Sequence, residues 1–547
     1  MGLEDALLEN ALAHLSLDEE ACDAPAWRVQ ERYTSAPDEI RNGIEAFGYY
    51  DGAISSSLEF AAACWSARFD VDPGEPVLVR NLDISITGEA DQDPPFETII
   101  DRVGLAPGEP LNHSVYDQVK RALLDLARAR GYVDAQYATS RLDVYPAELA
   151  ADITLHFESG PRYRFGQIDL QQSVLDEQLL ARYVDFSQGD LYDAVKVADL
   201  YSALTGSGYF DRVDVRPLAP NPANQEIPIR VDLQPGTRRL LTYGVGYSTD
   251  TGPRFRMGRI NIRRNERGHQ SNINLQLSPV VSELTYTYRL PYGDPRSEWL
   301  SFQTGIKHED TETSSSDSLE FGVRRLVPLQ GSWRHSQFVD FLLEDFIIGD
   351  EEGRSRLLMP GVDWTKLVAD DTLRPSAGHR LNFELRGAAD SLGSDTSFVQ
   401  AAVSAKWIWS LPNAARILVR GELGTTWEDD FNKLPPSVRF FAGGDTSVRG
   451  YEYESLGPLN ADGEVVGGSS LAVASVEYEH PVVPGWSVAA FVDSGNAFNG
   501  SDIDAKTGAG VGFRWQSPLG PIRVDVAKPL DGDDRGARLH ISFGPDL

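Results

Sequence analysis

The sequence predicts three α+β repeats followed by an all-β transmembrane barrel of about sixteen antiparallel strands. Two observations support this fold class. A degenerate unit of roughly 80 residues recurs along residues 1–236, which indicates a repeat architecture. From residue 237 to residue 547 the helical period disappears, and apolar residues alternate with polar ones as they do in half-buried strands. No run approaches the about 18 apolar residues of a membrane-spanning helix, whereas the strands of a membrane barrel alternate and average to a polar hydropathy.

Each repeat carries a glycine followed by an aromatic residue, after an amphipathic helix and before a strand. A glycine in this place ends the helix in the left-handed conformation, and the aromatic residue can pack back on the core. In the second and third repeats the periodicity runs strand, helix, helix, strand, strand, whereas the first repeat lacks an opening strand. The expected repeats span 1–75, 76–160 and 161–236. Their signatures are Gly48-Tyr49-Tyr50-Asp51, Gly131-Tyr132-Val133-Asp134 and Gly208-Tyr209-Phe210-Asp211.

The chain is acidic, with 82 acidic and 50 basic residues and a formal net charge of −32. Half of that net charge lies in the first hundred residues. A nucleic-acid binder needs a basic face that displaces counterions, so the composition argues against that class of protein.

Cys22 and Cys64 are the two cysteines, and neither lies in a zinc or redox motif. In an oxidising compartment we expect them to form a disulfide bond, which would close a loop of about 40 residues and add a few kcal/mol of stability. Two buried thiols in a cytosolic protein are the alternative. The chain opens on an acidic, helical pattern without a charged-then-apolar signal segment. We therefore expect a signal to have been removed from the natural precursor and Met1-Gly2 to be an artificial start.

Alternation is clear in segments such as 241–248, 284–290, 381–386 and 417–423. A soluble sheet with one wet face would also alternate. Charges recur on the polar face, and Tyr, Trp and Phe enrich the apolar face, which favours a membrane barrel with a wet lumen and aromatic girdles. A membrane-crossing strand needs roughly 9–11 residues, so about 19 residues per strand and turn give about sixteen strands. We expect outer loops at Thr311–Ser318 and Asp350–Ser355.

One long motif is far more specific than this pattern. The run Arg439-Phe440-Phe441-Ala442-Gly443-Gly444-Asp445-Thr446-Ser447-Val448-Arg449-Gly450-Tyr451 resembles the long inward loop of the outer-membrane POTRA-barrel superfamily, with its Val-Arg-Gly-aromatic tip. Phe491-Val492-Asp493-Ser494-Gly495, Gly508–Arg514 and Pro518–Arg523 resemble later strands of the same superfamily. The resemblance implies that the repeats are POTRA domains and that residues 237–547 form the barrel, with an inward loop at 436–460.

The resemblance also implies an anchor for the loop. In the superfamily the loop arginine meets the aspartate of the aromatic-x-Asp-x-Gly strand and an acidic residue of the preceding strand. Carried over by motif, these residues are Arg449, Asp493 and Glu477, with Gly450 and Tyr451 completing the loop tip. An arginine offers five donors in a fixed fork that a carboxylate can accept in a bidentate pair. Glu479 shares the face of Glu477, and a solvated Arg449 is the alternative to the anchor.

Three repeats before a barrel, and a Gly-Pro ending after the last strand, resemble the TamA family within that superfamily. We expect a weak lateral seam between the first strand, 240–248, and the last strand, 538–543. Glycines in the first strand and Gly544-Pro545 after the last favour weak pairing there, and an incoming strand could add to the exposed edges. The expected seam residues are Leu241, Tyr243, Gly244, Gly246, Ile541 and Phe543.

The implied function is the insertion of client proteins, such as autotransporter-type barrels, into the outer membrane of a Gram-negative bacterium. The N-terminal domains would lie in the periplasm, and a TamB-like periplasm-spanning partner would dock through the first POTRA unit. The sequence leaves open whether phospholipids are moved as well. A two-partner-type secretion pore for a dedicated exoprotein is the alternative. We find no nucleophile elbow, phosphate loop or metalloprotease motif, and expect no enzyme activity, metal or cofactor.

Overall fold

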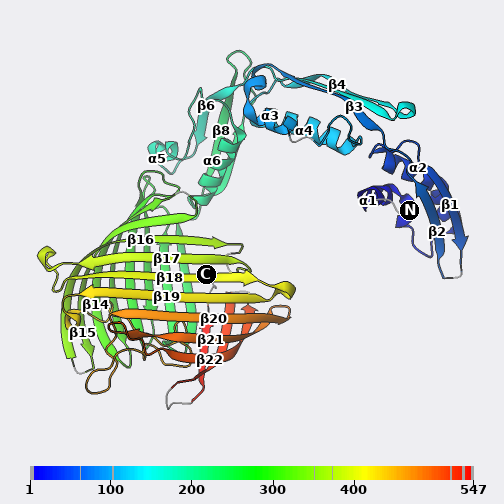
Figure 1. Cartoon of the computed structure of the whole chain (residues 1–547). Helices are drawn as coiled ribbons and strands as arrows, with labels where there is room; N and C mark the ends of the chain where they lie inside the picture. The colour runs from blue at the N-terminus through cyan, green and yellow to red at the C-terminus, as the bar shows by residue number, and fades with distance from the viewer. Residues whose placement is uncertain are drawn as a thin grey trace. The chain divides into compact units, whose positions relative to one another are not determined.

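The computed structural model describes most of the chain (Figure 1). It confirms the predicted fold class: α+β repeats come first, and a single sheet of sixteen antiparallel strands follows. The chain forms two compact units: one holds the first two repeats and most of the third, and the other holds the barrel and the remaining segments of the third repeat. No helix within the described residues is long and apolar enough to cross a membrane. The described residues are 5–61, 63–101, 104–329, 331–349, 351–371, 374–517, 520–531 and 536–543.

The second repeat follows the predicted order of elements. Its strand β5 is central, pairing in parallel with β3 and antiparallel with β4. Helix α4 starts after Asn112, whose side chain accepts a hydrogen bond from the Ser114 backbone nitrogen at 2.9 Å. Apolar residues of α4 and the sheet, such as Leu123 and Phe157, are fully buried between the two layers. The elements are β3 (Leu78–Thr87), α3 (Pro94–Asp101), α4 (His113–Ala129), β4 (Gln136–Tyr145) and β5 (Ala150–Glu158).

The third repeat has the same order, and its strand β6 pairs in parallel with the central strand β8. The recurring glycines take positive φ angles, 88° at Gly48, 87° at Gly131 and 72° at Gly208. A Cβ on Gly131 would lie 2.8 Å from the Cβ of Tyr192, so this glycine also lets consecutive repeats approach each other. The elements are β6 (Arg164–Gln171), α5 (Glu177–Ala181), α6 (Ala194–Gly206), β7 (Phe210–Pro217) and β8 (Glu226–Pro235).

The first repeat has a two-stranded sheet, and no strand precedes its helices within the described residues. A disulfide bond joins Cys22, which precedes the long helix, to Cys64 in the turn between the two strands, with the Cα atoms 4.6 Å apart. The elements are α1 (Asp5–His14), α2 (Ala26–Glu45), β1 (Ala53–Phe60) and β2 (Trp65–Asp72). The exact domain boundaries stay predictions.

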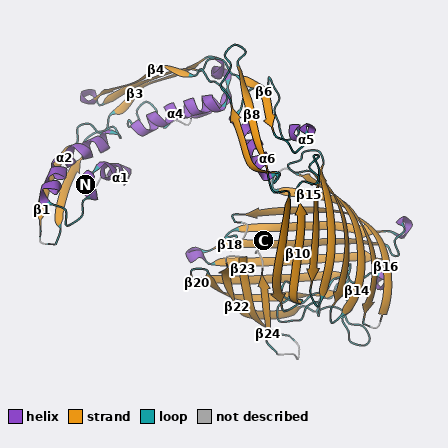
Figure 2. Cartoon of the chain, turned by 180° about the vertical axis from the view of Figure 1, so that it is seen from behind, coloured by secondary structure: helices purple, strands orange, loops and turns teal. Residues whose placement is uncertain are grey.

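In the barrel each strand pairs antiparallel with the next one along the chain, and the helices belong almost entirely to the N-terminal repeats (Figure 2). The strands are β9 (Arg239–Ser248), β10 (Gly252–Asn261), β11 (Gln270–Leu277), β12 (Val281–Pro291), β13 (Trp299–Asp310), β14 (Ser314–Pro328), β15 (Trp333–Ile348), β16 (Glu351–Ala369), β17 (Gly378–Ala388), β18 (Phe398–Ser410), β19 (Arg416–Glu428), β20 (Ser470–Val483), β21 (Trp486–Phe498), β22 (Lys506–Ser517), β23 (Gly520–Pro529) and β24 (Arg538–Phe543).

Most of the two segments expected as outer loops belongs to strands instead. β14 begins at Ser314 and β16 at Glu351, so the predictions for Thr311–Ser318 and Asp350–Ser355 were wrong over most of their length; Asp350 itself lies outside the described residues. A polar composition does not end a strand, because ladder bonds are made by the backbone and the polar side chains extend past the apolar band.

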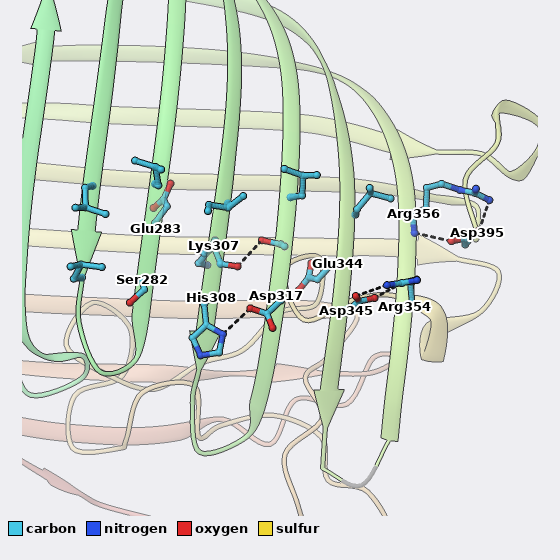
Figure 3. Close-up of a pocket in the computed structure, with 17 residues that line it drawn as sticks. Ser282, Glu283, Lys307, His308, Asp317, Glu344, Asp345, Arg354, Arg356 and Asp395 are labelled. Atoms are coloured by element: carbon cyan, nitrogen blue, oxygen red, sulfur yellow. Dashed lines mark hydrogen bonds and ion pairs between the residues drawn. The ribbon is translucent and has the colours of Figure 1, made fainter.

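The outward face shows where the apolar band ends. Across four neighbouring strands, Leu284, Ile306, Leu319 and Leu343 pair in one row. The next outward row, toward the turn after β13, is polar (Figure 3). In this row a histidine of β13 is hydrogen-bonded to an aspartate of β14, and an aspartate of β15 forms an ion pair with an arginine of β16. A row of aliphatic side chains followed by a row of polar and charged ones is typical of a membrane–water boundary. The polar row is Ser282, His308, Asp317, Asp345 and Arg354.

Candidate functional site

The loop between β19 and β20, residues 429–469, folds against the inner face of the barrel and includes the predicted inward segment 436–460. Backbone bridges tie its two arms together, Phe440 to Gly468 and Ala442 to Leu456. Val448, next to the loop tip, is fully buried. The loop is therefore an ordered part of the barrel interior.

Arg449 at the loop tip is fixed to Asp493 of β21 by three hydrogen bonds. Its Nε donates to Asp493 Oδ2 at 2.7 Å and its Nη2 donates to Asp493 Oδ1 at 2.9 Å. The backbone nitrogen of Arg449 also donates to Asp493 Oδ2, at 3.1 Å. Arg449 is 6% exposed and Asp493 is fully buried. This bidentate pair removes both charges from water, so its energy depends on every remaining donor and acceptor being satisfied.

The remaining donors of Arg449 reach two other strands. Its Nη1 donates to Glu477 Oε2 of β20 at 2.7 Å and to Asp525 Oδ2 of β23 at 3.1 Å. A second buried arginine, Arg514 of β22, donates to the other oxygens of these carboxylates, to Glu477 Oε1 at 2.6 Å and to Asp525 Oδ1 at 2.5 Å. Two guanidinium groups and three carboxylates thus form one buried cluster, the anchor cluster: Arg449, Arg514, Glu477, Asp493 and Asp525.

The pKa of Arg449 shows that the cluster favours the charged form. Burial alone lowers the pKa of this guanidinium, because desolvation penalises the charge. The hydrogen bonds that Arg449 donates to Asp493, together with the negative charges of Asp493, Glu477 and Asp525, act in the opposite direction and raise the pKa above its ordinary value. The guanidinium carbon also lies 3.3 Å from the centre of the Phe491 ring, which adds a cation–π contact.

Glycines make room for the loop tip on the wall. A Cβ on Gly508 of β22 would lie 1.8 Å from the carbonyl oxygen of Arg449. Gly450 has a φ of 101°, and a Cβ there would lie 3.0 Å from the carbonyl carbon of Lys528. The loop backbone can approach β22 and β23 this closely only because both positions are glycine.

Two further side chains hold the tip. Arg420 of β19 donates hydrogen bonds to the carbonyl oxygens of Thr446 and Ser447, the latter at 2.5 Å. The Tyr451 hydroxyl donates to the carbonyl oxygen of Asp531 at 3.3 Å. The tip is thus held from β19 on one side and from the end of β23 on the other.

The structure gives different partners to the two glutamates of β20, which the sequence analysis placed on the same face. Glu477 contacts Arg449, whereas Glu479 pairs with Arg416 of β19. It also brings in three residues that the sequence analysis missed: Arg514, Asp525 and Ser475, whose Oγ donates to Asp493 Oδ1 at 2.6 Å. Strand alternation could have identified Arg514, because it places this residue on the same face as Gly508, Gly510 and Gly512.

The expected seam lies between β9 and β24, the two ends of the strand order. These strands lie close together, yet no ladder joins them within the described residues. Leu241 and Tyr243 face outward and are 52% and 65% exposed. Alternation places Gly244 and Gly246 on the inner face and Ile541 on the outer face. The side chain of Phe543 lies outside the described part of the structure.

Comparisons with known proteins agree with this architecture. The family model described as the Omp85 superfamily domain matches residues 245–545. The model described as POTRA domain, TamA domain 1, matches residues 1–73, and a further POTRA model, described as a surface antigen variable number repeat, matches residues 163–236.

The curated relatives include outer membrane protein assembly factors named BamA. That of Nitratidesulfovibrio vulgaris is 23% identical over 442 residues, covering 76% of this chain and 55% of the relative. That of Neisseria meningitidis serogroup B is 22% identical over 520 residues, covering 82% of this chain and 64% of the relative. The chain therefore spans less than two thirds of the length of these relatives.

Among solved structures, BamA from Haemophilus ducreyi lacking POTRA domains 1–3 aligns with a TM-score of 0.70 at 16% identity. The alignment covers 85% of this chain and 99% of the other. At this level of identity, the likeness establishes the fold.

Proposed function

This chain belongs to the Omp85 superfamily, and from that membership we propose that it inserts client proteins into the outer membrane through the seam between β9 and β24. It is an outer-membrane barrel whose POTRA domains lie in the periplasm. The observation that carries the proposal is that no ladder joins β9 and β24 within the described residues, whereas every other pair of neighbouring barrel strands is hydrogen-bonded. The match of residues 1–73 to a TamA domain supports autotransporter-type barrels as the clients.

The physical argument concerns the free edges of two strands. In a bilayer an unpaired backbone donor or acceptor costs several kcal/mol, so a barrel normally closes on itself. Where no ladder crosses the seam, backbone N–H and C=O groups on the facing edges of β9 and β24 do not bond to each other. A client strand that enters from the periplasm can hydrogen-bond to these edges by β-augmentation. It can then move into the lipid with its own backbone groups already paired.

Locking the seam tests the proposal. Cysteines would replace Tyr243 and Ile541, and a bifunctional thiol reagent would join them across the seam. The native cysteines already form a disulfide bond and do not react. We expect the locked protein to fold but to lose insertion of an autotransporter-type client, and reversal of the cross-link to restore it.

A cross-link inside the wall is the matched control. Phe513 of β22 and Val524 of β23 face each other in an intact ladder, so cysteines there would join strands that are already paired. Insertion should survive this cross-link. Normal client insertion by the seam-locked protein would refute the lateral mechanism, and steady ion conductance by the purified barrel would favour the secretion pore.

For the partner we propose that a TamB-like protein adds a strand to the first repeat. In the second and third repeats the central strands β5 and β8 each carry a parallel neighbour. The corresponding strand β2 of the first repeat pairs only with β1 among the described residues. Deleting residues 1–75 should abolish capture of a TamB-like protein while leaving the barrel folded; equal capture by the deleted and full chains would refute this site.

A further inference from the structure

The inward loop contacts both sides of the seam through one carboxylate, that of Asp445. On the side of the first strand, Asp445 Oδ2 accepts a hydrogen bond from Ser248 Oγ, at the end of β9, at 2.7 Å. Its Oδ1 accepts from Thr249 Oγ1 at 3.1 Å. On the side of the last strand, Oδ1 lies 2.5 Å from Nδ1 of His540 in β24. The same side chain therefore holds two strands that share no ladder in the described part of the chain.

The hydrogen bond at the second ring nitrogen of His540 determines which atom donates in the contact between His540 and Asp445. Nε2 of His540 lies 2.9 Å from the backbone nitrogen of Gly450, and a backbone N–H can only donate. Nε2 must therefore accept, so Nδ1 carries the proton and donates to Asp445. Since Gly450 follows Arg449, His540 links the seam directly to the tip held by the anchor cluster.

The loop geometry presents Asp445 to the seam. Gly443 and Gly444 have φ angles of 104° and 102°. A Cβ on Gly444 would lie 2.6 Å from Oδ2 of Asp250, in the turn that follows β9. The same Asp250 oxygen accepts a hydrogen bond from the Asp445 backbone nitrogen at 2.6 Å. The glycines thus allow the loop to lie against the β9–β10 turn.

The contact is buried, so its bonds are not in competition with bulk water. The side chains of Asp445 and His540 are 6% and 5% exposed. Asp250, Asp445 and His540 also place three potential ligand atoms within 4.8 Å of one another, but hydrogen bonds within the group account for this arrangement. A nearby ion pair between Arg538 of β24 and Glu452 of the loop, at 2.5 Å, adds a second tie to the last strand.

We infer that Asp445 and His540 are positioning residues that keep the seam closed by tying β9 and β24 to the inward loop. This inference rests on the proposed function, because it names the residues that would control the opening. A tie of a few side-chain bonds is weaker than a full ladder and can break and re-form without unfolding either strand. The loop tip would remain on the wall while the seam opens.

Distances across the seam test the inference without any client. Nitroxide labels on Tyr243→Cys and Ile541→Cys would report the separation of β9 and β24 by electron paramagnetic resonance. Asp445→Asn replaces one acceptor oxygen by a donor that faces Ser248 or His540, and His540→Phe removes both ring bonds. Each change should raise the population with long distances about tenfold, the factor that corresponds to ~1.4 kcal/mol.

A matched control removes another tie of the same loop. Ser437 donates a hydrogen bond to Glu344 of β15, far along the wall from β9 and β24, so Ser437→Ala should leave the distances unchanged. The double variant Asp445→Asn with His540→Phe should be less than additive, because both changes break one contact. Each variant is first checked for heat-modifiable gel migration, which reports a folded barrel.

Unchanged distances in both single variants, or an equal rise in Ser437→Ala, would overturn the inference. These outcomes are separate from the proposed function, since the labels report the seam whether or not a client is inserted. If the variants open the seam while client insertion does not depend on it, the positioning role stands and the lateral mechanism fails.

Discussion

Two parts of the barrel contact the same loop in opposite ways. The strands β20–β23 form a wall joined by ladders, and one of its arginines and three of its acidic residues bury the loop-tip arginine Arg449. The seam of β9 and β24 has no ladder within the described strands and holds the loop through Asp445 and His540. One side of the loop is thus fixed and the other is bound by a few bonds.

The difference follows from what each environment can support. A charge can be buried only where its partners are held in place, because a misplaced partner leaves an uncompensated ion. The laddered wall fixes the Cβ positions of Glu477, Asp493 and Asp525, so it can hold Arg449 and Arg514. The described strands of the seam lack this backbone support. Its buried contact with the loop uses the Asp445 carboxylate, which neighbouring donors share, and its second tie, between Arg538 and Glu452, is partly exposed.

The largest effect is expected from removing the loop-tip arginine that the wall binds. Arg449→Ala leaves three buried carboxylates with one arginine, which should lower the free energy of unfolding by about 3–5 kcal/mol. The temperature at which the barrel loses heat-modifiable migration should fall, and outer-membrane assembly should decrease. Arg449→Lys keeps the charge without the fork and should fall between wild type and Arg449→Ala. Wild-type unfolding and assembly in Arg449→Ala would remove the distinction between wall and seam.

A smaller effect should come from filling the space under the loop tip. Gly508→Ala places a methyl group 1.8 Å from the Arg449 carbonyl oxygen, so the tip must shift, at a cost of about 1–3 kcal/mol. Gly421→Ala in β19 is the matched control, because its nearest neighbour would be 3.9 Å away. Thermal unfolding of the two variants gives the comparison. Equal stability would show that the tip is not seated closely on β22.

The smallest effect is expected at the rim of the seam. Arg538 and Glu452 form an ion pair whose side chains are 35% and 39% exposed, so water and salt screen it. Arg538→Ala should change the free energy of unfolding by about 0–1 kcal/mol, and less at high salt. The measurement is the unfolding temperature at low and high ionic strength. A loss as large as that of Arg449→Ala would place a major support of the loop at the seam rather than at the wall.

Much of the fold could be predicted because its signals are local. The helix-ending glycines Gly48, Gly131 and Gly208 mark the repeats, and strand alternation marks the barrel. The pair of Arg449 with Asp493 followed from the resemblance of two motifs. The strand positions of Ser314 and Glu351 were missed because polar side chains hide the fact that a strand continues beyond the membrane.

By itself, the sequence determined the repeats, the alternation of the strands and the identity of the arginine at the loop tip, because each depends on residues close together in the chain. Only the tertiary structure decided that Asp525 joins Asp493 and Glu477 around Arg449, that Glu479 instead pairs with Arg416, and that Asp445 meets His540. These contacts depend on the register of strands far apart in the chain. A shift by one residue would turn every side chain to the opposite face, and no local pattern specifies that register across a long loop.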